Sequence, residues 1–121
     1  MGKNPSTWKR VEKDVGHMYG GDRIPITGRA RGSAADCTSR YPLGIEVKHR
    51  KALANYIVDG MDQAVASCSE GDTPIVVLHK KYTSVDDCYV VMRIKDHLSW
   101  TRKLFDDAKD MGIGGSVECK D

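Results

Sequence analysis

The sequence has no apolar run near the ~18 residues that a membrane-spanning helix needs, so no membrane segment is expected. The first ten residues, MGKNPSTWKR, lack the apolar stretch of a secretory signal peptide. The four cysteines form no CxxC pair and stand beside no paired histidines, which argues against a zinc site; they are Cys37, Cys68, Cys88 and Cys119. These absences predict a cytoplasmic protein with reduced thiols, and disulfides in a secreted protein are the less favoured alternative.

Aromatic residues make up only 7% of the chain, so a stacking platform for single-stranded nucleic acid is not expected. The chain of 121 residues predicts a single domain spanning residues 1–121. Its net charge of +2 hides an uneven distribution, since residues 1–51 hold 11 basic and 5 acidic side chains and residues 52–121 hold 8 and 12. A basic first half suggests a surface facing a polyanion, although on charge alone an unevenly charged solvated surface is the simpler explanation.

Hydrophobic periodicity and turn residues divide the chain into eight elements. Helices are predicted at 7–19, 52–69 and 96–111, with the first ended by Gly20–Gly21 and the last capped by Asp96. Strands are predicted at 23–27, 34–38, 43–49, 74–79 and 88–94, where 34–38 and 43–49 form a hairpin and 74–79 is buried on both faces. The tail at 112–121 is expected to fray. This order predicts an α/β protein, a sheet flanked by helices.

The hairpin carries the most informative residues. Side chains alternate along a strand, so Glu46 and Lys48 share one face while Ile45 and Val47 point into the core. The preceding strand brings Asp36 to the same face as Glu46. Two carboxylates suit Mg²⁺, which is held by one or two carboxylates together with phosphate oxygens. A lysine beside them could stabilise charge on a phosphodiester. A cross-strand salt bridge is the structural alternative.

Asp36, nine intervening residues and Glu46-Val47-Lys48 resemble the motif of the PD-(D/E)XK nucleases. Together with Glu12 on the first helix and the run Gly32–Asp36, they are most similar to Holliday junction resolvases of the archaeal type and their viral relatives. The resemblance implies a restriction-endonuclease-like αβββαβ core, with a central mixed sheet flanked by helices, over residues 7–95. For a viral member, the compartment would be the host cytoplasm.

The resemblance also implies roles for individual residues. Asp36, Glu46, Glu12 and the backbone of Val47 would hold Mg²⁺, or Mn²⁺ in its place, and Lys48 would be the catalytic lysine. Glu12, Asp36 and Glu46 would count as catalytic too. Ser33 would lie near the scissile phosphate and Gln63 near the site. The chain departs from the family where Ala35 replaces a common proline and where Ser67 stands in place of a tyrosine.

Basic side chains surround this motif in the sequence and could contact phosphates. With Ser33, the predicted DNA-binding residues are Lys9, Arg10, Lys13, Arg29, Arg31, His49, Arg50 and Lys51. The resemblance implies branched double-stranded DNA, a four-way junction, as substrate and a homodimer as the active form. The last helix offers Leu98, Trp100, Leu104 and Phe105 as a dimer face or as monomer core. Nuclease action on other DNA and a non-catalytic DNA-binding module remain alternatives.

Overall fold

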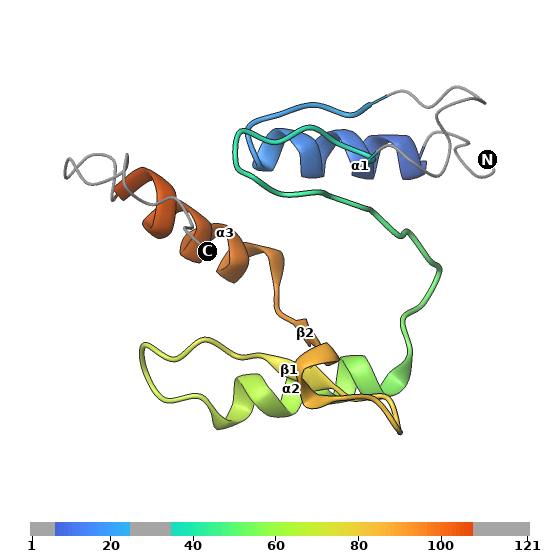
Figure 1. The fold of residues 1–121 in the computed structure, drawn as a ribbon, viewed down its shortest axis with the longest axis vertical. Coiled ribbons are helices and arrows are strands. Elements are labelled where there is room, and N and C mark those ends of the chain that lie inside the picture. The colour runs from blue at the N-terminus through green and yellow to red at the C-terminus, as the bar shows by residue number, and fades with distance from the viewer. Residues whose placement is uncertain (1–6, 25–34, 108–121) are drawn as a thin grey trace. The chain divides into compact units, whose positions relative to one another are not determined.

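A computed structural model describes residues 7–24 and 35–107 of the chain. The chain divides into two units, Met1–Arg50 and Lys51–Asp121, which are described separately (Figure 1). The first contains helix α1 (Thr7–Met18). The second contains α2 (Asn55–Ser67), β1 (Val76–Leu78), the short 3₁₀ helix η1 (Val85–Asp87), β2 (Tyr89–Val91), α3 (Ile94–Arg102) and the π-helical turn η2 (Lys103–Asp107).

Helix α1 ends where the glycine pair predicts. The N–H of Gly21 donates to the carbonyl of Gly16 at 2.8 Å, and that of Gly20 donates to His17 at 3.0 Å. Gly20 has a φ of 79°. These are the bonds and the left-handed residue of a Schellman motif, which satisfies carbonyls that the helix leaves open. The chain therefore reverses tightly after α1.

Three segments of the first unit lie side by side after this reversal. Cys37 forms an antiparallel bridge with Arg23 on one side and with Ile45 on the other. The bridge to Ile45 joins the two segments of the predicted hairpin, 34–38 and 43–49. In the described part of the first unit these pairings are isolated bridges and not regular strands. Asp36 donates its N–H to the Ile45 carbonyl at 2.8 Å, so two residues of one segment face one residue of the other, as in a β-bulge. The part of the first predicted strand after Ile24 lies outside the described residues.

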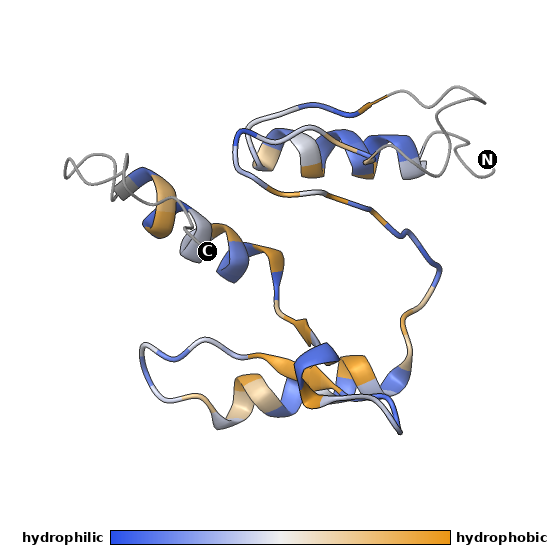
Figure 2. Cartoon of the chain, viewed as in Figure 1, coloured by the Kyte–Doolittle hydropathy of each residue, from blue (hydrophilic) through white to orange (hydrophobic). Residues whose placement is uncertain are grey.

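The second unit is built on an antiparallel hairpin with α2 packed beside it. Val76 pairs with Val91 and Leu78 with Tyr89. A Cβ on Gly60 of α2 would lie 3.3 Å from Val76, which shows how closely the helix approaches β1. Figure 2 shows hydrophobic residues gathered on this hairpin and on α2. The prediction that this first strand is buried on both faces is wrong, because Val77 is 55% exposed and only the other side of β1 faces α2.

Helix α3 begins two residues earlier than predicted and ends at Arg102, where the π-helical turn η2 follows directly. Arg93 stands at the N-cap, so the prediction that Asp96 caps the helix is wrong. The Asp96 carboxylate instead accepts a hydrogen bond from Arg93 Nε at 2.8 Å inside the first turn, where a negative charge also suits the helix dipole. The Trp100 indole donates to Thr73 Oγ1 at 3.0 Å and ties α3 to the segment before β1.

None of the helices in the described ranges is long and apolar enough to cross a bilayer. Three of the cysteines, Cys37, Cys68 and Cys88, are free thiols. The predicted mixed sheet would join segments of both units and stays a prediction, as does the restriction-endonuclease-like core. Residues 108–121, with the predicted end of the last helix, the frayed tail and Cys119, lie outside the described residues.

Candidate functional site

Two carboxylates are buried in the first unit, those of Glu12 on α1 and Asp36 on the central bridged segment, with 8% and 6% of each residue exposed. Buried carboxylates are costly unless a cation or hydrogen bonds compensate their charge. For Glu12 the compensation is an ion pair, because Arg23 Nε donates to its Oε1 at 2.7 Å. The charge of Glu12 is thus already matched within the protein.

Asp36 is compensated differently. Its Oδ2 accepts a hydrogen bond from the backbone N–H of Val47 at 2.6 Å. This bond places the carboxylate against the backbone of the Glu46-Val47-Lys48 motif, eleven residues further along the chain. Within the described ranges Asp36 forms no ion pair. A buried carboxylate with a hydrogen bond but no cation beside it is suited to take up a positively charged ligand.

Glu46 and Lys48 point to one side of their segment, as the alternation predicts. Lys48 Nζ lies 3.2 Å from Glu46 Oε2. The lysine side chain is 67% exposed and the glutamate side chain is 57% exposed. An ion pair this exposed contributes little to stability, because water screens it and both side chains lose freedom. The pair therefore leaves both side chains free to rearrange around a ligand at small cost.

Cys37, the neighbour of Asp36, is buried against the backbone of α1. Its Sγ donates to the Glu12 carbonyl at 3.2 Å and the residue is buried. Burial raises the pKa of this thiol above its usual 9.0, and the negative charges of Asp36 and Glu12 raise it further. The thiol is therefore kept protonated and serves as a packing group.

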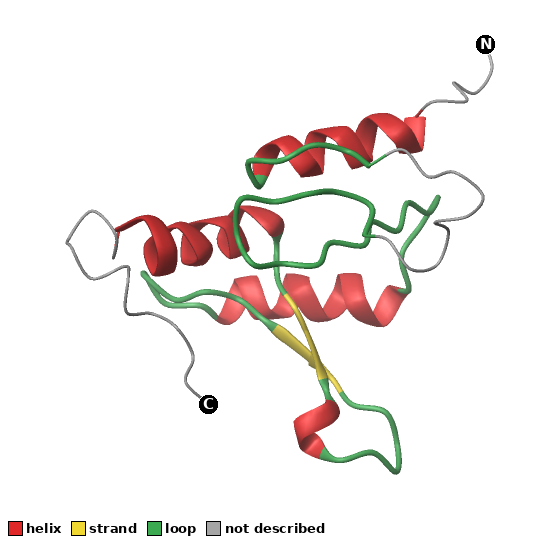
Figure 3. Ribbon diagram, turned by 45° about the horizontal axis from the view of Figure 1, so that its top comes forward, coloured by secondary structure: helices red, strands yellow, loops and turns green. Residues whose placement is uncertain are grey.

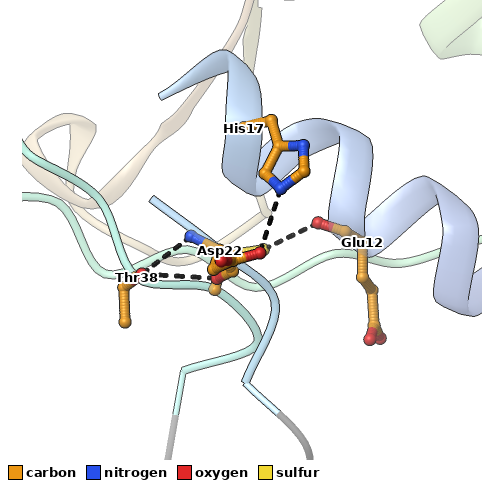
Figure 4. A network of polar contacts seen from close by, with 5 residues as sticks. Glu12, His17, Asp22 and Thr38 are labelled. Carbon is orange, nitrogen blue, oxygen red and sulfur yellow. Dashed lines mark hydrogen bonds and ion pairs between the residues drawn. The ribbon is translucent and has the colours of Figure 1, made fainter. Parts of the chain in front are cut away.

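A second polar network holds the reversal after α1 in place (Figure 4). His17 Nε2 lies 3.0 Å from Asp22 Oδ1, and the Asp22 N–H donates to Thr38 Oγ1 at 2.8 Å. The backbone of Asp22 also accepts the N–H of Thr38 at 2.8 Å. In Figure 4 the Glu12 carboxylate points away from the His17–Asp22 pair. The network therefore fixes the backbone around Arg23 without competing for Glu12.

Sequence reasoning missed Arg23, Asp22 and Thr38. Arg23 lies eleven residues from Glu12, and no local spacing rule pairs an arginine on one segment with a glutamate on another. The one available signal was that Glu12 occupies the inner face of α1, beside Gly16 and Tyr19, which are also buried. A glutamate on such a face needs a cationic partner nearby.

The predicted metal ligands are partly brought together. Asp36 lies against the peptide that follows Glu46, whereas the Glu12 carboxylate is bound by Arg23. In the part of the chain that the structure describes, no group of three or more histidine, cysteine, aspartate or glutamate side chains could hold a metal ion. A protein usually binds Mg²⁺ through only one or two carboxylates, while phosphate oxygens and water supply the other ligands. Asp36 and Glu46 would be such a pair of carboxylates.

Several predicted DNA-binding residues lie on exposed surface. Lys9, Arg10 and Lys13 occupy the outer side of α1, and His49, Arg50 and Lys51 follow the Glu46-Val47-Lys48 motif, all of them exposed. Lys9 also lies 5.3 Å from the ring centre of Trp8. The predicted contacts Arg29, Arg31 and Ser33 lie outside the described residues.

The remaining predicted residues belong to the second unit. Gln63 is exposed on α2, and its predicted place near the site stays untested. Of the candidate dimer residues, Leu98 is buried within the chain, whereas Trp100 and Leu104 are each 56% exposed. The monomer-core alternative therefore holds for Leu98. Comparison of the chain with protein families, curated proteins and solved structures finds no match.

Proposed function

We propose that the protein is a Mg²⁺-dependent endonuclease that hydrolyses phosphodiester bonds of branched DNA, with the four-way junction as its preferred substrate. The observation that carries the proposal is the position of Asp36. Its carboxylate is buried, lacks an ion pair among the described residues and is hydrogen-bonded to the backbone between Glu46 and Lys48. An aspartate, a glutamate and a lysine in this relation supply the groups that phosphodiester hydrolysis needs.

In this proposal Asp36 and Glu46 would hold the metal, and Mn²⁺ could replace Mg²⁺. The bound ion would supply positive charge that polarises the scissile phosphodiester. Asp36 is suited to a fixed ligand, because the Val47 N–H orients its carboxylate. Glu46 is suited to a movable ligand, because its only partner among the described residues is the exposed ammonium of Lys48.

Lys48 is proposed to stabilise the negative charge that builds up on the phosphate during hydrolysis. Its ammonium lies at 3.2 Å from Glu46, so a glutamate drawn towards a metal would release the lysine to face the substrate. The exposed cations of α1 and of His49–Lys51 would bind the neighbouring phosphates. Glu12 would join the metal site only by giving up Arg23.

The proposed active form is a homodimer, because a two-fold junction is cut at two related positions by two sites. The proposed location is the cytoplasm, that of the host for a viral protein.

The test is cleavage of end-labelled four-way junction, fork and linear duplex DNA, with Mg²⁺ or with EDTA. The proposal expects paired, symmetric nicks in the junction only when Mg²⁺ is present. Asp36→Asn and Lys48→Ala should each abolish cleavage. Asp59→Asn and Lys95→Ala remove exposed side chains of the same type elsewhere in the chain and should leave cleavage unchanged.

Each result has a distinct meaning. Equal cleavage of fork or linear DNA would support nuclease activity but contradict the four-way junction as the preferred substrate. If the protein binds junction DNA but does not cleave it in the presence of any divalent metal, the protein is a non-catalytic DNA-binding module and the proposal is wrong. Cleavage that survives Asp36→Asn would show that the candidate site is not the active site.

A further inference from the structure

The loop between β1 and β2 presents a tyrosine at its tip in an unusual backbone conformation. Tyr82 is 91% exposed and has a φ of 71°, the only positive φ of a non-glycine residue in the described ranges. Left-handed backbone crowds a side chain, so a bulky residue is rarely placed there. Glycine or asparagine would occupy this conformation more easily, which makes the tyrosine itself the feature to explain.

The tip is held by specific bonds. The N–H of Thr83 donates to the Lys80 carbonyl at 3.1 Å, which closes a four-residue turn with Tyr82 in its third position. Thr83 Oγ1 donates to the same carbonyl at 2.6 Å, and His79 Nε2 lies 2.9 Å from the Thr83 carbonyl. Figure 3 shows the loop extending past the ends of the two strands. The turn therefore fixes the position of the tyrosine instead of leaving it on a loose loop.

Two cations accompany the ring. Lys80 and Lys81 are exposed, and Lys81 Nζ lies 5.1 Å from the centre of the Tyr82 ring. The same loop carries Asp86 and Asp87 in η1, on its return to β2, so its positive charge is confined to the tip. An exposed aromatic ring with adjacent ammonium groups matches a nucleotide, which offers a flat base and a phosphate next to it.

We infer that Lys80, Lys81 and Tyr82 form a nucleic-acid contact, in which Tyr82 stacks on an unpaired or splayed base and the lysines bind the adjoining phosphates. The inference rests on the proposed function only in taking nucleic acid as the ligand, and it uses none of the residues of the candidate metal site. It adds one stacking contact, not a platform of several rings, for exposed base faces. Such faces occur where stacking is interrupted at a branch point and in single strands, but not within a linear duplex.

The test measures binding and not cleavage, so that it does not depend on the nuclease activity. Fluorescence anisotropy in EDTA would compare a four-way junction, a single-stranded oligonucleotide and a linear duplex. Tyr82→Ala should weaken binding to the junction and the single strand about tenfold, as expected for the loss of one stacked base, and change duplex binding little. Tyr82→Phe should bind as the unchanged protein does.

A matched control and a folding control accompany these variants. Tyr89→Ala removes another exposed tyrosine of the same hairpin, one with ordinary strand backbone, and should leave binding unchanged. Tyr82→Gly relieves the crowded backbone, so its urea midpoint should rise while its affinity for single strands falls. That combination separates a loss of contact from a loss of fold. The double variant Lys80→Ala/Lys81→Ala should weaken binding to all three DNAs and reduce its salt dependence.

The outcomes keep the two proposals apart. If Tyr82→Ala binds junction and single strand as tightly as the unchanged protein, the inference is wrong, whatever the nuclease assay gives. If binding depends on Tyr82 but no DNA is cleaved, the inference stands and the proposed function fails. If the unchanged protein binds none of the three DNAs, both are overturned and a protein partner becomes the better explanation of the exposed tip.

Discussion

Arg23 Nε donates to Glu12 Oε1 at 2.7 Å, and the side chains of both residues are largely shielded from water, with 22% and 10% exposed. The pair joins the inner face of α1 to the segment that bridges to Cys37, the neighbour of Asp36. The Arg23 guanidinium also lies 5.5 Å from the centre of the Trp8 ring. Arg23 therefore holds α1 to the segment that lies beside Cys37.

The first prediction concerns this ion pair. Arg23→Ala should lower the free energy of unfolding by about 2–4 kcal/mol, because it leaves a buried carboxylate without a cation. Glu12→Leu combined with Arg23→Met should cost much less than Arg23→Ala alone, since no unpaired charge remains. Urea denaturation measures both. Lys48→Ala, which breaks the exposed pair with Glu46, serves as the control and should cost under about 1 kcal/mol. Equal losses for Arg23→Ala and Lys48→Ala would contradict the assignment.

A second prediction tests metal binding at Asp36 without measuring activity. Asp36→Asn keeps an acceptor for the Val47 N–H and removes the buried charge, so without metal the variant should be more stable by about 1 kcal/mol. With Mg²⁺ at ten times its dissociation constant, the unchanged protein should gain about 1.4 kcal/mol. The variant should gain nothing. Thermal unfolding at matched ionic strength measures these differences.

The control for this measurement is Asp59→Asn, an exposed aspartate of α2. It should respond to Mg²⁺ as the unchanged protein does. A stabilisation by Mg²⁺ that persists in Asp36→Asn would place the metal elsewhere. A loss of stability in Asp36→Asn without metal would show that the Val47 hydrogen bond fully compensates the charge of Asp36, so that no bound cation is needed.

The third prediction uses the glycines after α1. A Cβ on Gly21 would overlap the backbone carbonyl of Thr38, and only a movement of the backbone could relieve this overlap. Gly21→Ala should therefore cost more than Gly20→Ala, for which the left-handed φ costs about 1–2 kcal/mol before any displacement of the Arg40 side chain is counted. A Cβ on Gly44 would have no atom within 4 Å, so Gly44→Ala should change the free energy of unfolding very little.

Urea midpoints of these three variants should follow the order Gly44, Gly20, Gly21 from mildest to most severe. If Gly21→Ala is as stable as Gly44→Ala, the segment after α1 does not approach Thr38 as closely as described.

The fourth prediction is a pH dependence that arises from Cys37. Burial, together with the charges of Asp36 and Glu12, raises the pKa of this thiol above 9.0. Well below pH 9.0 the thiol is protonated in the folded and the unfolded chain alike. Above that pH the unfolded chain loses the proton while the folded chain retains it, so the free energy of unfolding falls as pH rises towards the folded pKa.

Cys37→Ala should make this decline shallower between about pH 8 and pH 10. The comparison is of slopes, because the substitution also removes packing. Val15→Ala, a half-buried position on α1, loses packing without losing a thiol and should keep the slope of the unchanged protein. Identical slopes for Cys37→Ala and the unchanged protein would contradict the prediction.

The local features of the first unit could be predicted from the sequence. Helix α1 starts and ends within one residue of the predicted bounds, because the glycine pair Gly20–Gly21 ends it. The antiparallel approach of the Cys37 and Ile45 segments follows from the predicted hairpin, whereas its register was not predicted. The shared face of Glu46 and Lys48 follows from strand geometry alone.

What the sequence did not reveal depends on contacts between distant residues. Apolar periodicity marks a face but does not say what covers it, so Val77 on β1 was expected in a core and is exposed. The partner of Glu12 could have been any nearby cation, and only the packing of the reversal after α1 selects Arg23. The left-handed conformation of Tyr82 has no sequence signal, because tyrosine is not a residue that favours it.

The tight reversal after α1 also bears on the order in which the protein folds. The contacts described above that fix Asp36 and its neighbours join residues at most 25 positions apart, the longest being that between Glu12 and Cys37. Short separations carry a small loop-closure entropy, so such contacts form early and quickly. During synthesis, the surroundings of Asp36 could therefore assemble once Val47 has left the ribosome, before the second unit is complete.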